Sequence, residues 1–218
     1  MSGSSTRKSK NEAWSNIVPG REEQHRLKKQ AILETAAELI IEAGFQGASV
    51  DELARRLKIT KPTLYHYIPS KDDIALELLN LNFYAADKAL KAANSRRGTG
   101  LDRLRFFAVQ YAELMATPIG AAAVQIATLP HSEKVRTHLT ELFRKVDFSA
   151  RRFIIDGIED GSIRQCDARW IDFLFFGALH WMTRWFHPED GQSASEVAEK
   201  LFEIIEFGIS PRNQAEVD

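Results

Sequence analysis

The chain has 218 residues, of which 44% are hydrophobic and 27% charged, and a net charge of −1, which is typical of a soluble globular protein and excludes a disordered or fibrous one. A single cysteine, Cys166, excludes an internal disulfide and agrees with a reducing compartment. The polar N-terminus lacks the apolar core of a signal peptide, and polar residues interrupt the most apolar stretch, 170–186. We therefore expect a cytoplasmic protein without a membrane span.

The predicted elements begin after a polar, basic arm over residues 1–22, in which Pro19-Gly20 marks the end. Apolar residues then recur every three or four positions, which predicts a helix from about Glu23 to Ala43, ended by Gly44. The capping box Ser49-Val-Asp-Glu52 starts a second, short helix, and Thr60 is the expected N-cap of a third.

The rest of the chain is also expected to be helical, because no stretch shows sustained period-2 alternation. Capping residues and helix breakers delimit six more helices, at about 70–94, 101–116, 120–129, 132–160, 167–187 and 193–208. The sequence therefore predicts an all-α fold of about nine helices. We divide it into a three-helix DNA-binding domain (23–70), a ligand-binding and dimerisation domain (71–210) and a tail (211–218).

The segment 48–71 has the outline of a helix-turn-helix: two short helices joined by a tight turn, with the small Ala54 where they must approach closely. The charge distribution agrees, since residues 1–71 carry 12 basic against 8 acidic side chains, and residues 72–218 carry 17 against 22. Leu64, Tyr67 and Ile68 are expected in the core. Groups suited to phosphates and base edges follow one another on the second helix of the pair: Thr60, Lys61, Thr63, Tyr65 and His66.

The order of motifs over about residues 27–79 resembles the tetracycline-repressor (TetR) family of bacterial regulators. The motifs are Gly44-Phe45, Asp51-Glu-Leu-Ala54, Leu64-Tyr-His-Tyr67 and Ser70-Lys-Asp-Asp73; one departure is that the family often has Gly near Lys58-Ile59. The resemblance implies a helix-turn-helix that binds duplex operator DNA. It adds three candidate contact residues: Ser49, Lys71 for phosphate, and Tyr67, which either touches phosphate or closes the domain core.

The C-terminal part is similar to a TetR subgroup that responds to acyl-CoA thioesters, which implies an apolar, elongated effector site. Residues 101–187 carry more aromatic side chains than a bundle of this size needs, with isolated polar groups among them, although each ring could also simply fill the core. The candidate ligand-binding residues are Phe107, Gln110, Tyr111, Arg152, His180, Trp181 and Arg184.

Two apolar stripes near the C-terminus favour a homodimer held by a four-helix interface, the alternative being that the stripes are internal core. The candidate interface residues are Trp170, Leu174, Gly177, Ala178, Trp185, Val197, Leu201, Ile204, Ile205 and Gly208.

No metal-ligand motif, cofactor motif or catalytic motif is found, so neither an enzyme nor a metal or cofactor site is expected. We expect a repressor released from its operator by an apolar effector. The alternative is a DNA-binding activator or architectural protein without an effector, which a solid C-terminal core would favour.

Overall fold

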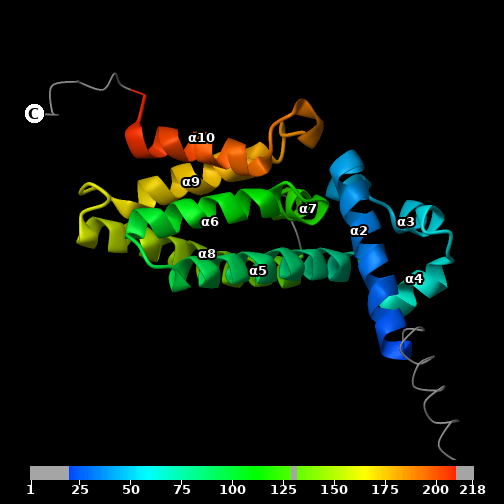
Figure 1. The fold of residues 1–218 in the computed structure, drawn as a ribbon. Coiled ribbons are helices and arrows are strands. Elements are labelled where there is room, and N and C mark those ends of the chain that lie inside the picture. The colour runs from blue at the N-terminus through cyan, green and yellow to red at the C-terminus, as the bar shows by residue number, and fades with distance from the viewer. Residues whose placement is uncertain (1–19, 129–131, 210–218) are drawn as a thin grey trace, which may run out of the picture.

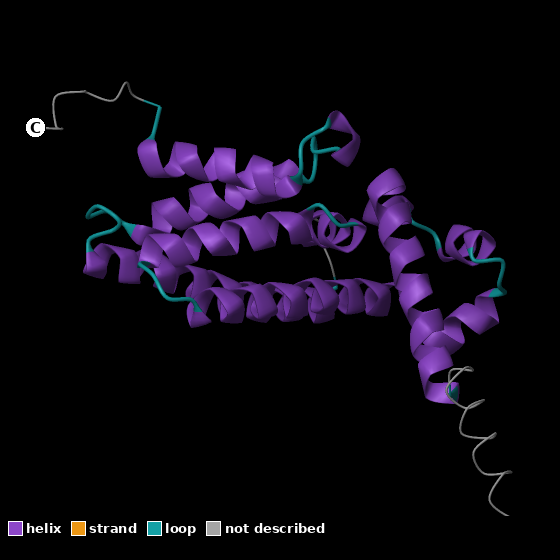
Figure 2. Ribbon diagram, viewed as in Figure 1, coloured by secondary structure: helices purple, strands orange, loops and turns teal. Residues whose placement is uncertain are grey.

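A computed structural model describes residues 20–128 and 132–209 of the chain, which contain α-helices, one 3-10 turn and no strand (Figures 1 and 2). The all-helical prediction is confirmed. The elements are α2 (Arg21–Gly47), α3 (Val50–Arg56), α4 (Lys61–Tyr67), α5 (Lys71–Ser95), α6 (Gly100–Met115), α7 (Pro118–Ala127), α8 (Glu133–Asp160), α9 (Ala168–Met182), η1 (Pro188–Asp190) and α10 (Ala194–Phe207).

Side-chain caps fix most helix starts where the sequence placed them. Ser49, Thr60 and Ser70 each accept a hydrogen bond from the backbone N–H three residues on, which satisfies one otherwise unpaired donor. Ser193 and Glu196 form a reciprocal capping box at the start of α10. Gly44 interrupts α2 with φ of 71°, a conformation that glycine adopts without steric cost.

Several predicted boundaries differ from the structure. Helix α2 continues past Gly44 to Gly47, and α7 spans Pro118–Ala127 instead of 120–129. Helix α2 begins at Arg21, so the last two residues of the predicted arm are helical. Helix α9 ends at Met182 instead of continuing to residue 187, because the Thr183 hydroxyl donates to the His180 carbonyl and turns follow up to Pro188. The remainder of the predicted arm and the predicted tail lie outside the described residues.

The helices form two parts (Figure 1). The head consists of α2, α3 and α4; α2 runs across the end of the body, which consists of α5–α10. In the body the long helices α5, α6, α8, α9 and α10 are stacked side by side, and α7 closes the end next to α2. None of the described helices is long and apolar enough to cross a bilayer.

The apolar core is continuous from the head into the body. Leu33, Ala37 and Ile40 of α2 belong to the same buried cluster as Leu78 of α5 and Ile126 of α7. A second cluster fills the far part of the body between α5, α6, α8, α9 and α10. Since α2 packs on both α5 and α7, a shift of these two helices would move the head.

Candidate functional site

The turn between α3 and α4 fixes the relative position of the two short helices. Within the turn, the backbone N–H of Ile59 donates to the carbonyl of Ala54, and Lys58 has a φ of 54°. Lys58 therefore occupies a left-handed conformation, which costs free energy for any residue that has a Cβ. Ala54 is buried, as expected for a small residue at the close approach of two helices.

Helix α4 presents a polar face to solvent and an apolar face to the core. Leu64 and Ile68 are buried beneath it, while Lys61, Thr63, Tyr65 and His66 are exposed. The Thr60 and Thr63 hydroxyls lie 2.8 Å apart at the start of the helix, where Pro62 has no N–H and the N–H of Thr63 donates to Thr60, so these two hydroxyls are the polar groups offered to a phosphate. This is the geometry of a helix that can enter a groove of DNA, with two hydroxyls, a cation and a phenol directed outward.

Acidic neighbours pair with most of the cations around this face. Arg55 bonds Glu52, and Arg56 bonds both Glu52 and Glu42, which fastens α3 to α2. The two guanidinium groups lower the pKa of Glu52 to about 2. Lys61 lies 2.5 Å from Asp51, and this carboxylate raises the pKa of Lys61.

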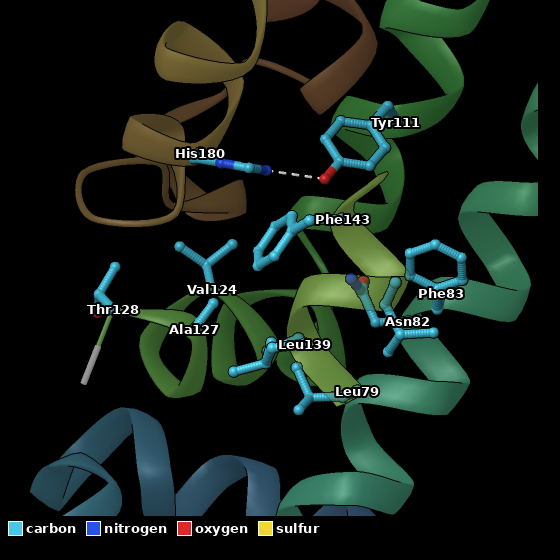
Figure 3. A pocket seen from close by; sticks show the side chains of 12 residues that line it. Leu79, Asn82, Phe83, Tyr111, Val124, Ala127, Thr128, Leu139, Phe143 and His180 are labelled. Atoms are coloured by element: carbon cyan, nitrogen blue, oxygen red, sulfur yellow. Dashed lines mark hydrogen bonds between the residues drawn. The ribbon is translucent and has the colours of Figure 1, made fainter. Parts of the chain in front are cut away.

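A neutral pair of side chains occupies the middle of the body. The Tyr111 hydroxyl and His180 Nε2 are 2.8 Å apart and joined by a hydrogen bond (Figure 3). Burial lowers the pKa of His180 to about 4 and raises that of Tyr111, so both groups are uncharged at neutral pH.

The His180–Tyr111 pair lines two cavities of about 180 and 440 Å³ that share Asn82, Phe83 and Phe143 as further wall residues. The smaller one extends toward the head between α5, α7 and α8, with Leu79, Val124 and Leu139 in its wall (Figure 3). The larger one reaches α9 and includes Asp172. Mostly apolar walls with a few polar groups are typical of sites for small organic molecules.

Comparison with known proteins assigns the chain to a family. The family model described as "Tetracyclin repressor-like, C-terminal domain" matches residues 97–209, and the model "Bacterial regulatory proteins, tetR family" matches residues 32–78. The chain belongs to the TetR family. It is therefore a DNA-binding transcription regulator, and as a member of this family it is not an enzyme.

Several relatives match most of the length of this TetR-family chain. The fatty acid metabolism regulator protein of Bacillus subtilis is 22% identical over 189 residues, which cover 85% of this chain and 97% of the relative. The crystal structure of the TetR-family regulator PfmR from Thermus thermophilus has a TM-score of 0.75 at 28% identity, covering 83% and 99% of the two chains. That of AibR in complex with isovaleryl coenzyme A and operator DNA has a TM-score of 0.72 at 23% identity, covering 81% and 96%.

The structure brings most of the predicted DNA contacts of this TetR head to one side. Ser49 caps α3 and is exposed. Tyr67 is half-buried, with its ring centre 4.7 Å from that of His25 on α2, a neighbour that the sequence did not indicate. Lys71 turns inward: its Nζ donates to the Gln46 carbonyl at 3.0 Å, and burial lowers its pKa.

Only two of the seven predicted ligand residues, Tyr111 and His180, line the cavities. Phe107 is fully buried behind Tyr111, with ring centres 5.3 Å apart, so it supports the wall without reaching the cavity. Arg152 pairs with Asp156 and Glu159 on the far part of α8, which places it outside the site. Three more residues also lie outside the cavity walls: Gln110, which bonds Glu113, and the exposed Trp181 and Arg184.

The sequence reasoning missed the part of the site on α5, namely Leu79, Asn82 and Phe83. A polar Asn82 directly before Phe83, in an otherwise amphipathic helix, is a weak signal that could have indicated a cavity wall.

Helices α9 and α10 lie at the outer edge of the body (Figure 1), and their exposed apolar side chains form one surface. We call it the α9/α10 surface, and its most exposed large side chains are Trp170, Phe173, Leu174, Trp181 and Ile204. Trp185 and Gly208 are exposed as well, Ala178, Leu201 and Ile205 are half-buried, and a Cβ on Gly177 would meet nothing within 4 Å. Val197 is the exception among the predicted interface residues, since it packs into the core of its own chain.

Proposed function

We propose that this TetR-family chain is a homodimeric repressor, that it binds operator DNA through the exposed face of α4, and that an apolar effector in the body releases it. We infer that the effector is an acyl-CoA thioester or a related lipid-derived molecule. The observation that carries the proposal is the place of the smaller cavity: α5 and α7 contribute to its wall, and the same two helices pack against α2 of the head.

The DNA-binding part rests on the outward side chains of α4 and on the two hydroxyls at its start. In a groove, Thr63 and Tyr65 would contact bases or backbone, and Lys61 would exchange Asp51 for a phosphate. Lys71 already holds the Gln46 carbonyl, so we now assign it first to fixing α5 on the head and only second to phosphate.

The effector part rests on the apolar walls and on the uncharged His180–Tyr111 pair, which can hydrogen-bond a carbonyl without needing a countercharge. The similarity to AibR, crystallised with isovaleryl coenzyme A, and to a fatty acid metabolism regulator supports a ligand of this class. The presence of cavities instead of a solid core favours this function over that of an architectural protein or activator without an effector.

Release would follow from a shift between two shapes of the body. Leu79 of α5 and Ala123 and Ala127 of α7 line the smaller cavity, at the end next to the head. A ligand that fits better when these helices move apart would carry α2 and α4 away from operator spacing. The effect on DNA cannot exceed the ligand's preference for that shape, and a tenfold loss of affinity needs about 1.4 kcal/mol of coupling.

Dimerisation would use the α9/α10 surface. Trp170 and Trp181 are 70% and 66% exposed, and an apolar area of this kind on a regulator is usually covered by a partner. Two copies related by a twofold axis would form a four-helix interface and place two heads on one face of a near-palindromic operator, in the cytoplasm.

The test combines DNA binding with effector release. Tyr65→Ala and Thr63→Ala should each weaken operator binding by about 1–3 kcal/mol in a mobility-shift titration, and both variants should stay dimeric in light scattering. Octanoyl-CoA should lower the affinity of the parent protein for its operator. Saturating operator DNA should in turn lower the affinity of the protein for octanoyl-CoA by the same factor. Parent-like DNA binding by both variants would refute the assignment of α4, and identical thioester affinity with and without operator would refute the role of inducer.

A further inference from the structure

A polar cluster beneath the larger cavity is not used by the function proposed so far. Asp172 of α9 is only 1% exposed although it carries a carboxylate, and it belongs to the cavity wall. One of its oxygens, Oδ2, accepts a hydrogen bond from Arg151 of α8 at 2.9 Å, and Arg151 also bonds Asp147 at 2.9 Å. The other oxygen, Oδ1, has no hydrogen-bond partner among the described residues.

Burying the Oδ1 acceptor of Asp172 costs free energy unless a hydrogen-bond donor reaches it. A buried acceptor without a donor loses its hydration and gains nothing in return. Asn82 of α5, which lines the same cavity, likewise has a buried side-chain oxygen, Oδ1, without a partner among the described residues. The larger cavity therefore has an unused carboxylate acceptor on one side and an unused amide acceptor on another.

The charge balance of this cluster favours a donor over an anion. Asp147 and Asp172 both line the larger cavity, while Arg151, whose single positive charge pairs with both, is not among its wall residues. Burial and the Asp147 carboxylate raise the pKa of Asp172, which reflects how poorly this place tolerates negative charge. The one cation among the described wall residues is Arg144, which is exposed and so stands at the rim.

We propose that Asp172 is a specificity-determining residue that requires a hydrogen-bond donor, a hydroxyl or an amide N–H, on the part of the effector inside the larger cavity, and that it excludes a free carboxylate there. The inference rests on the proposed function in that it takes the cavity as the effector site. Asp172 would distinguish effectors that the apolar walls alone would accept equally. It would favour an alcohol, or a thioester that carries a hydroxyl or amide N–H, over a free fatty acid.

The direct test uses two isomers that differ only in the donor, octan-1-ol and 1-methoxyheptane, titrated into the full-length dimer by calorimetry. The parent protein should bind the alcohol about tenfold more tightly than the ether, because only the alcohol can donate a hydrogen bond to the otherwise unpartnered Oδ1 of Asp172. Octanoate should bind at least about tenfold more weakly than the alcohol, because its carboxylate would face Asp172 and Asp147.

Two variants decide whether Asp172 is responsible. The double variant Arg151→Met/Asp172→Leu replaces the buried ion pair by apolar side chains of similar size, a change that proteins often tolerate; its preference for the alcohol should vanish. Thr140→Val is the matched control, since Thr140 lines the same cavity but its hydroxyl already donates to the Arg136 carbonyl. This control should keep the preference. Equal binding of the isomers by the parent, a preference that survives in the double variant, or no binding of either isomer would overturn the proposal.

A second comparison identifies which donor the natural class of ligand supplies. If 3-hydroxyoctanoyl-CoA binds about tenfold more tightly than octanoyl-CoA and the double variant abolishes the difference, the donor is a hydroxyl on the acyl chain. If both thioesters bind alike and both lose affinity in the double variant, the donor is an amide N–H of the pantetheine arm. Alcohol binding that depends on Asp172 without any release of operator by thioesters would refute the proposed function and leave this inference intact.

Discussion

The head and the body of this protein carry their polar groups in opposite ways. In the head, Thr63, Tyr65 and Lys61 stand on the outside of a short helix over a filled apolar core. In the body, His180, Tyr111 and Asp172 lie inside, around space that the core leaves open. Local features, such as capping residues and a turn, are therefore enough to shape the head. The body depends on long helices that are held apart around the cavities and packed tightly elsewhere.

Gly100 offers the most drastic way to test how tightly the body is packed away from the cavity. A Cβ at this position would overlap backbone atoms of Phe153 and Gly157, where α6 crosses α8. Backbone cannot move aside as a side-chain end can, so Gly100→Ala should lower the free energy of unfolding by about 3 kcal/mol. Urea unfolding followed by circular dichroism measures the change.

Gly20→Ala is the matched control, because its added Cβ would meet nothing within 4 Å. It should cost less than about 1 kcal/mol, the scale of losing a glycine at a helix start. Similar stability of the Gly100→Ala variant and the control would mean that the two helices do not approach as closely as the structure indicates.

The pH dependence of stability shows whether His180 is buried and neutral in the body. Its pKa is about 4 in the folded chain and about 6.5 when the chain is unfolded, so between these values the unfolded state binds a proton that the folded state refuses. Stability should be unaffected by this group above pH 6.5 and fall as the pH drops from 6.5 toward 4. The expected loss at about pH 5 is about 2 kcal/mol.

His180→Gln removes the titration and keeps a neutral partner for the Tyr111 hydroxyl. The difference in unfolding free energy between the parent and this variant should therefore shift in favour of the variant by about 2 kcal/mol between about pH 7 and pH 5. A difference that is the same at both pH values would contradict a buried, neutral histidine.

These two regions also differ in how well the sequence predicted them. The head was predicted in detail because Ser49, Thr60 and Ser70 are caps that act on neighbours three residues away, and because the motif order is specific to a family. The cavity could be predicted only as an excess of aromatic residues. Which rings face it depends on how α5, α6, α8 and α9 turn about their axes, and this is decided by contacts between residues far apart in the chain.

Individual residues show the same difference. Phe107 and Tyr111 are one helical turn apart on α6, yet Phe107 is in the core and Tyr111 reaches the cavity. The family resemblance implied that Lys71 contacts phosphate, and the structure adds that it lies over the Phe45 ring and donates to the Gln46 carbonyl. Asp172 was considered only as an interruption of an apolar stretch, since its partner Arg151 is 21 residues away.

Lys58 provides a test of the turn in the head. It adopts a left-handed conformation that glycine adopts freely, at the point where the family often has glycine. Lys58→Gly should raise the free energy of unfolding by about 1 kcal/mol, after allowing for the greater freedom of glycine in the unfolded chain. Lys58→Ala is the control: it removes the same charge but keeps a Cβ, so it should bring no such gain in a thermal-unfolding comparison at fixed concentration.

The smallest effect is expected from Asp51, whose carboxylate holds Lys61 beside the face of α4. Both side chains are at least half exposed, so their pairing contributes little to folding, but the carboxylate competes with phosphate for the lysine and repels the DNA backbone. Asp51→Asn should therefore strengthen DNA binding about threefold at low salt, for specific and non-specific sequences alike, and the gain should shrink as salt screens the charges.

Glu159→Gln at the far end of α8 makes the same change in net charge away from the head and should leave DNA binding unchanged (Figure 1). An equal gain from both variants in fluorescence anisotropy would assign the effect to net charge. A gain from Asp51→Asn alone would mean that the neighbouring carboxylate limits how strongly Lys61 binds DNA. The strength of an exposed group of the head is then set by the side chain next to it, whereas that of the body's polar groups is set by burial.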